Sequence, residues 1–312
     1  MSKIQTAISI LKNNRADFLC AFFESLRHTR FLVLLSDRCF IKLLYWVYFK
    51  TPINLKDPKT FNEKLNWLKL YFRLPIMRKL VDKYEVKEYV SKKIGKEYII
   101  PTLNVWYSFD AIDIKDLPNK FVLKGAHDSS SVVICKNKAT FNLEHFRSRL
   151  ESSLQSDLFN WGREWPYKDL PKRIIAEEML EDPHGLMDYK FFCFNGYVRC
   201  FKIDFDRFSN HRANYYDRDA NLLGIGEVVC PPDIRDFKMP DNLGKMIQLS
   251  EKLAEGFPFV RVDFYNVNGK IYFGEMTFFP ASGFGLFVNM KDDLLLGSWL
   301  KLPSQSMNNI EK

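Results

Sequence analysis

The chain is poor in the residue patterns that mark local metal sites. Its six cysteines, at positions 20, 39, 135, 193, 200 and 230, form no C-x-x-C pair and no zinc-like cluster. None of the other four histidines lies at ligand spacing from His127, which favours a loop hydrogen-bonding role for that residue. A cleavable signal peptide is also not recognised, so we expect reduced thiols and a cytoplasmic protein.

Internal repeats and low-complexity tracts are missing too, which argues against solenoids. The longest apolar run, residues 31–50, is interrupted by Asp37, Arg38 and Lys42 and is not a clean membrane span. An amphipathic helix remains, which either packs on the protein or lies at a membrane interface. In the second case basic side chains would meet anionic lipid: Arg27, Arg30, Arg38, Lys42 and Lys50.

What the chain does have is length, apolar residues and positive charge. With 312 residues, 46% of them hydrophobic, it can bury a substantial core as one multi-lobed unit or two domains. The formal net charge of +8 favours an anionic partner, such as a nucleotide, an acidic polysaccharide, a nucleic acid or a membrane surface.

Local patterns predict helices and strands in an α+β arrangement. Thr60 followed by Glu63 is typical of a capping box opening a helix, and a further helix is expected from Asp82 to Gly95. Strands are expected at residues 97–103, 120–125 and 173–180, and a hairpin at 188–207 turns at Asn195-Gly196. A helix over residues 241–255 leads into a last hairpin.

The last hairpin, Val260 to Gly283, carries three charged residues among apolar ones. A two-residue Asn268-Gly269 loop would place Glu275 on the face opposite Asp263. A three-residue loop including Val267 would instead pair Arg261 with Glu275 and bring all three charges together. Two converging carboxylates suit Mg²⁺, whereas the alternative is a solvated face of an ordinary hairpin.

Several phrases resemble the TupA-like branch of the ATP-grasp superfamily. They are PKTFNEKLNWLKLY, LVDKYEVKEYV, YIIPTLNVW, FVLKGAHDSSSVVICK, GREWPY, RIIAEEML, DYKFFCFNG and GFPFVRVDFYNVNGKIYFGEMTFFPASGF, spread from about Pro58 to Gly285. The resemblance implies an ATP-grasp fold, in which two mixed or antiparallel sheet lobes clasp ATP after N-terminal helices. It divides the chain into an N-terminal helical segment (1–57), a first lobe (58–118), a nucleotide-binding and catalytic region (119–302) and a polar tail (303–312).

The resemblance also implies roles for individual residues. Asp263, Glu275 and Thr277 would hold magnesium, and Arg261 and Lys190 would act in catalysis. The ATP-binding set would be Lys83, Lys124, Ser129, Ser130, Ser131, Glu177, Met179, Leu180 and Asp188. Ser282 and Gly283 are further candidates near the acceptor.

Two positions depart from the family pattern. The phosphate loop is usually glycine-rich, but here Asp128 and three serines follow Gly125, and Asp128 would repel phosphate unless it turns away. Thr277 stands where the superfamily often has asparagine, and a hydroxyl is a weaker magnesium ligand than an amide oxygen.

The implied activity is an ADP-forming carboxylate-amine ligase that uses ATP and Mg²⁺ and proceeds through an acylphosphate. The expected partners are an acidic glycan or uronic acid of a bacterial surface polysaccharide and an amine, with no nucleic acid. A cytoplasmic protein, peripheral to the inner face of the membrane, would suit a lipid-linked glycan.

Two alternatives remain open. One is a glycosyltransferase, for which Asp204-Phe205-Asp206 is a weak D-x-D next to Arg207. These residues are otherwise an exposed strand end or an acceptor-binding rim. The other is a noncatalytic nucleotide- or glycan-binding protein.

Overall fold

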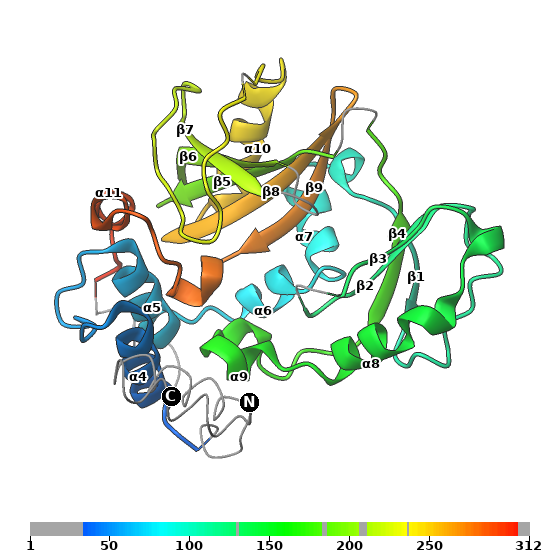
Figure 1. The fold of residues 1–312 in the computed structure, drawn as a ribbon, viewed down its shortest axis with the longest axis horizontal. Helices are drawn as coiled ribbons and strands as arrows, with labels where there is room; N and C mark the ends of the chain where they lie inside the picture. The colour runs from blue at the N-terminus through cyan, green and yellow to red at the C-terminus, as the bar shows by residue number, and fades with distance from the viewer. Residues whose placement is uncertain (1–33, 129–130, 183–185, 206–210, 236, 305–312) are drawn as a thin grey trace, which may run out of the picture.

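The computed structural model describes residues 34–128, 131–182, 186–205, 211–235 and 237–304. Two antiparallel sheets stand side by side, with helices α6 (Ile76–Val81) and α7 (Val86–Ile94) between them (Figure 1). This arrangement confirms the predicted α+β class with two sheet lobes.

The smaller sheet has the strand order β1-β4-β2-β3. Its strands are β1 (Thr102–Trp106), β2 (Phe121–Gly125), β3 (Val133–Cys135) and β4 (Ile174–Glu178). Helix α8 (Arg147–Gln155) packs on β2, and the short α9 (Leu158–Gly162) follows it. Alternate residues of β2 are buried in a separate small core, because one face of the sheet is covered and the other is not.

The larger sheet has the order β7-β6-β5-β8-β9. Its strands are β5 (Asp188–Phe194), β6 (Tyr197–Phe205), β7 (Arg212–Asp217), β8 (Phe259–Val267) and β9 (Lys270–Thr277). One face, with Phe191, Phe201 and Phe264, lies under helix α10 (Leu243–Ala254). Side chains alternate across a strand, so the neighbouring residues Lys190 and Lys202 share the other face.

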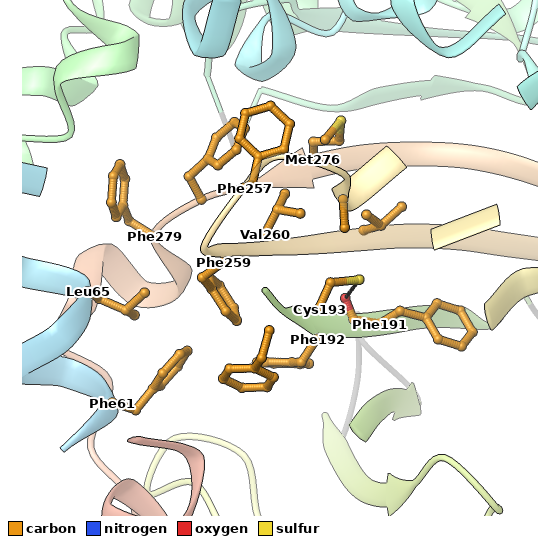
Figure 2. Close-up of a cluster of buried hydrophobic side chains, with 14 of the residues drawn as sticks. Phe61, Leu65, Phe191, Phe192, Cys193, Phe257, Phe259, Val260, Met276 and Phe279 are labelled. Carbon is orange, nitrogen blue, oxygen red and sulfur yellow. Dashed lines mark hydrogen bonds between the residues drawn. The ribbon is translucent and has the colours of Figure 1, made fainter. Parts of the chain in front are cut away.

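The N-terminal helices and the last helix close one end of the larger sheet. Helices α4 (Asp37–Phe49), α5 (Phe61–Tyr71) and α11 (Met290–Trp299) join its main core. Figure 2 shows Phe61 and Leu65 of α5 facing Phe259, and the Phe61 and Phe259 ring centroids are 4.9 Å apart. Burial of these large side chains fixes α5 against the sheet.

The structure confirms two local predictions and moves the start of two predicted elements. Thr60 and Glu63 form the predicted capping box, and Asn195-Gly196 is the two-residue turn between β5 and β6. The helix expected from Asp82 begins only at Val86, because the Asp82 carboxylate accepts hydrogen bonds from two backbone N–H groups in a preceding turn. The strand expected at residues 97–103 begins only at Thr102.

The apolar segment around α4 packs on the protein. Phe40, Ile41, Leu44 and Tyr45 are buried in the main core, which is one of the two fates expected for this helix. Within the described part of the chain, no helix has the length and apolar character needed to cross a membrane. Arg27 and Arg30 lie outside the described residues.

Candidate active site

The β8–β9 hairpin reaches the predicted convergence by a different route from the one expected. The loop is the two-residue Asn268-Gly269, since Val267 pairs with Lys270, so the three-residue loop was wrong. The register then shifts at Gly274, which lets Asp263 pair directly with Glu275. A β-bulge, one extra residue in β9, therefore corrects the parity that the short loop would otherwise impose.

Arg261 joins the two carboxylates of this hairpin. Its guanidinium donates to both oxygens of Asp263, at 2.7 Å each, and to Oε1 of Glu275 at 2.6 Å. It also donates to Oγ1 of Thr277 at 3.1 Å, and that hydroxyl donates to Glu275 at 3.1 Å. The predicted metal residues and the predicted catalytic arginine thus form one cluster.

Lys190 occupies the neighbouring strand beside the same cluster. Its ammonium donates to Asp263 at 2.9 Å and to Asp188, and Asp204 lies 3.5 Å away. Burial alone would lower the pKa of Lys190, but Asp188 and Asp263 hold it above its usual value. Lys190 is therefore a permanent positive charge in the centre of the sheet face.

The Glu275 carboxylate also stays ionised, because positive charges surround it. Burial would raise its pKa, but Arg261 and then Lys83 lower it to about 2. Its side chain is 38% exposed, against 3% for Asp263. A cation entering this site would meet Glu275 first, and the oxygen donors of Asp263, Glu275 and Thr277 are of the type that Mg²⁺ prefers.

A second cluster of charged side chains lies on the smaller sheet and the helix beside it. Glu177 of β4 is buried and binds two ammonium groups, that of Lys124 on β2 and that of Lys87 on α7 at 2.7 Å. Burial would raise the Glu177 pKa, but these lysines keep it below the usual value. One buried carboxylate thus fixes two cations that would otherwise be mobile on the surface.

Lys83 connects the two sheets electrostatically. Burial lowers its pKa, and the charges that act on it next are Glu275 of the larger sheet and Lys124 of the smaller one. Its backbone N–H donates to the carbonyl of Ala126 at 2.8 Å, and its ammonium donates to the carbonyl of Asp128. Lys83 thus lies within electrostatic range of both Glu275 and Lys124.

The loop after β2 is held by its own side chains. Ser131 accepts from the backbone N–H of Gly125 and donates to Asp128, each at 2.7 Å. Asp128 is buried, so its carboxylate turns inward, the condition for the loop to admit phosphate. Ser129 and Ser130 lie outside the described residues.

The remaining predicted residues are placed as follows. Met179 and Leu180 come just after β4 and are half-buried. The Glu177 carboxylate forms ion pairs with Lys87 and Lys124. Ser282 is buried, with its carbonyl accepting from the ammonium of Lys69 at 2.7 Å and its hydroxyl bonded to Glu164. Ser282 therefore supports the backbone beside the hairpin.

Sequence reasoning missed Lys87 and Lys202. Lys87 lies four residues after Lys83, in the first turn of α7, and this closeness along the chain was a usable signal. Lys202 pairs with Glu227 at 3.1 Å and lies 3.4 Å from Asp204.

Asp204, for which one expectation was an exposed strand end, is buried. Burial would raise the pKa of Asp204, but Lys202 and Lys190 lower it to about 2. Asp206 and Arg207 lie outside the described residues.

A cavity of about 120 Å³ adjoins the hairpin. Its polar lining includes Lys202, Glu227 and Arg261, and its apolar wall includes Phe61 and Phe192. Arg261 therefore faces both the paired carboxylates and a partly open cavity with room for part of a small molecule.

Solved structures similar to the chain include D-alanine-D-alanine ligase from Helicobacter pylori (16% identity, 77% of this chain and 69% of that chain, TM-score 0.42). The L-amino acid ligase from Bacillus licheniformis is another (12% identity, 80% and 57%, TM-score 0.43). No curated protein matches the sequence. The model of the TupA-like ATP-grasp family matches residues 63–301, and the chain belongs to that family.

Proposed function

We propose that this protein is an ADP-forming carboxylate-amine ligase that uses ATP and Mg²⁺. The observation that carries the proposal is that a charged cluster on the larger sheet lies close to the lysines near the smaller sheet. The larger sheet contributes Arg261, Asp263, Glu275 and Lys190. The charge of Glu275 acts on Lys83, which lies in the turn before α7 and donates its backbone N–H to Ala126, just after β2. A polyphosphate between the sheets would find cations on both sides.

Residues from both sheets and from the turn before α7 would bind the nucleotide. Lys83 and Lys124 would neutralise phosphate oxygens, and Glu177 would hold Lys124 in place. The segment of Met179 and Leu180, which leaves β4 without further strand pairing, would offer its backbone and apolar side chains to adenine. Asp188 would accept hydrogen bonds from the ribose hydroxyls.

Asp263, Glu275 and Thr277 would hold magnesium, whose chemistry is to neutralise and orient the phosphates. Arg261 and Lys190 are already fixed by carboxylates, so they are preorganised to stabilise negative charge on the transferred phosphoryl group. In the first step the substrate carboxylate attacks the γ-phosphorus, giving an acylphosphate and ADP. In the second an amine attacks the acyl carbon and phosphate leaves.

The substrate we propose is a uronic acid unit of a bacterial surface polysaccharide. Lys202 and Arg261 in the cavity would attract its carboxylate, and Phe61 and Phe192 offer apolar surface to a sugar ring. The net charge of +8 suits an acidic glycan. Such a substrate would place the protein in the cytoplasm, with peripheral contact to the membrane when the glycan is lipid-linked.

The test is binding of a nonhydrolysable ATP analogue with and without Mg²⁺, followed by ADP release with uronic acids and amines. Glu275→Gln should weaken the Mg²⁺-dependent binding by ~10-fold or more, because a ligand charge is lost. The matched control Glu63→Gln, in the α5 capping box, should leave binding unchanged. Binding indifferent to Mg²⁺ and to Glu275 would refute the proposal, and a sugar-nucleotide requirement without ATP turnover would favour glycosyl transfer.

A further inference from the structure

Three side chains that the ligase reaction does not use converge where β6 and β7 meet on the larger sheet, next to Lys190. Asp204 is the second-last residue of β6, His211 directly precedes β7, and Cys230 lies in a turn after β7. One carboxylate oxygen, one imidazole nitrogen and one sulfur lie within 4.8 Å of one another. They are 26 residues apart from first to last, which is why no local spacing reveals them.

The oxygen and the nitrogen face each other without a hydrogen bond. Asp204 Oδ1 and His211 Nε2 are 3.4 Å apart, and both atoms are shielded from solvent without a hydrogen-bond partner in the described part of the chain. Two ligands of a tetrahedral zinc ion, at bond lengths of ~2.0–2.1 Å, are about 3.4 Å apart. The pair therefore already has the separation that a shared cation requires.

The sulfur needs only a small adjustment. A tetrahedral site with a zinc–sulfur bond of ~2.3 Å separates sulfur from a nitrogen or oxygen ligand by about 3.6 Å. The Cys230 sulfur lies within 4.8 Å of the other two atoms. We expect rotation of the Cys230 or His211 side chain to bring the three atoms to these separations.

The backbone that carries the three residues is tied together. Asp204 pairs with Ala213 across β6 and β7, and the Ala213 N–H donates to the carbonyl of Pro231 at 3.1 Å. Asn214 exchanges hydrogen bonds with the backbone of Asp233 at 2.9 and 3.0 Å. The segments that follow His211 and Cys230 are thus fixed to each other, so the site is preorganised.

The neighbouring lysines have their own counterions. Lys202 lies 3.4 Å from Asp204 but also pairs with Glu227 at 3.1 Å. Lys190 lies 3.5 Å from Asp204 and is bound by Asp188 and Asp263. A thiolate and a carboxylate would supply the two negative charges that a divalent cation needs.

We infer that Asp204, His211 and Cys230 form a binding site for a Zn²⁺-class divalent cation. The mixture of nitrogen, oxygen and sulfur donors suits zinc or cobalt and does not suit Mg²⁺, which takes oxygen. Three protein ligands leave a fourth position for water or another small ligand. This site shares no ligand with the hairpin carboxylates Asp263 and Glu275, and the Lys190 ammonium lies between Asp204 and Asp263.

The test is titration of the chelator-treated full-length protein with Co²⁺ in the absence of nucleotide. The expected result is one equivalent bound, with a thiolate-to-cobalt charge-transfer band that Zn²⁺ abolishes by displacement. Cys230→Ser should lose the band, and His211→Gln should weaken binding by ~10-fold or more. Cys39→Ser, which changes an exposed free cysteine on α4, should behave like the wild type.

Glu275→Gln should keep the band, so failure of this site and failure of the proposed nucleotide site give different results. Wild-type protein without a stoichiometric charge-transfer band would overturn the inference, leaving Asp204 and His211 as a buried acid–base pair. A band that survives in Cys230→Ser would overturn it as well, because another thiol would be the ligand. Far-ultraviolet circular dichroism checks that each variant is folded.

Discussion

Gly274 lies directly against the backbone of Asp263. A Cβ built on Gly274 would stand 3.1 Å from the Asp263 carbonyl oxygen and 3.3 Å from the Tyr265 ring. The bulge that brings Glu275 opposite Asp263 thus depends on a residue without a side chain at this point.

Gly274→Ala should therefore disturb both the hairpin and the metal-dependent function. The added methyl group requires a shift of the Asp263 backbone, which we expect to lower the free energy of unfolding by about 1–2 kcal/mol. Mg²⁺-dependent binding of an ATP analogue should weaken in the same variant. Urea unfolding and analogue titration measure the two effects, and wild-type values in both would show that the bulge tolerates a side chain.

Glu177→Gln should separate the role of the lysines from that of the metal. Without the carboxylate, Lys87 and Lys124 lose their common partner and repel each other. We expect analogue affinity to fall by ~10-fold, equally with and without Mg²⁺, in contrast to Glu275→Gln. Glu178→Gln is the matched control, because Glu178 is the exposed neighbour on the same strand. A loss confined to the Mg²⁺-containing titration would contradict this assignment.

Gly297→Ala should strongly destabilise the fold. Its Cβ would lie 2.2 Å from the carbonyl oxygen of Lys59 and 2.7 Å from the nitrogen of Phe61, where α11 crosses the start of α5. Backbone atoms must move, so we expect a loss of about 2–3 kcal/mol in the free energy of unfolding. Gly244→Ala on α10 is the matched control, since nothing lies within 4 Å of its Cβ. That variant should gain ~0.5–1 kcal/mol from helix propensity, and equal behaviour of the two variants would refute the close approach.

His127 should make stability depend on pH. It is buried, and its Nε2 donates to the carbonyl of Ser153 at 2.8 Å. Burial lowers its pKa below the ordinary 6.5, so the unfolded chain binds more protons in the window just below that value. Its contribution to stability is therefore present above pH 6.5 and falls as the pH drops through the lowered pKa.

The measurement is the free energy of unfolding in urea between pH ~5 and ~8 for the wild type and His127→Gln. The difference between the two proteins should narrow toward acid pH. A constant difference across the range would mean that His127 does not change its proton affinity on folding.

The sequence alone determined the features that depend on near neighbours. Thr60 and Glu63 are three residues apart, so their capping box needs no tertiary contact, and both Asn-Gly turns follow from the ease with which these residues adopt positive φ. The family phrases predicted the two-lobed α+β fold, and the pairing of Arg261 with Asp263 is a two-residue relationship along one strand.

Only the tertiary structure decided the rest, because the deciding contacts lie far apart in the chain. Parity from the turn alone would have separated Asp263 and Glu275, and the bulge at Gly274 appears only when β9 is packed against β8. Lys190 is buried among aspartates because three neighbouring strands each place one beside it, and the sequence around Lys190 does not reveal this. Asp204, His211 and Cys230 meet because β6, β7 and the following turn hydrogen-bond to one another, a relationship that no spacing along the chain records.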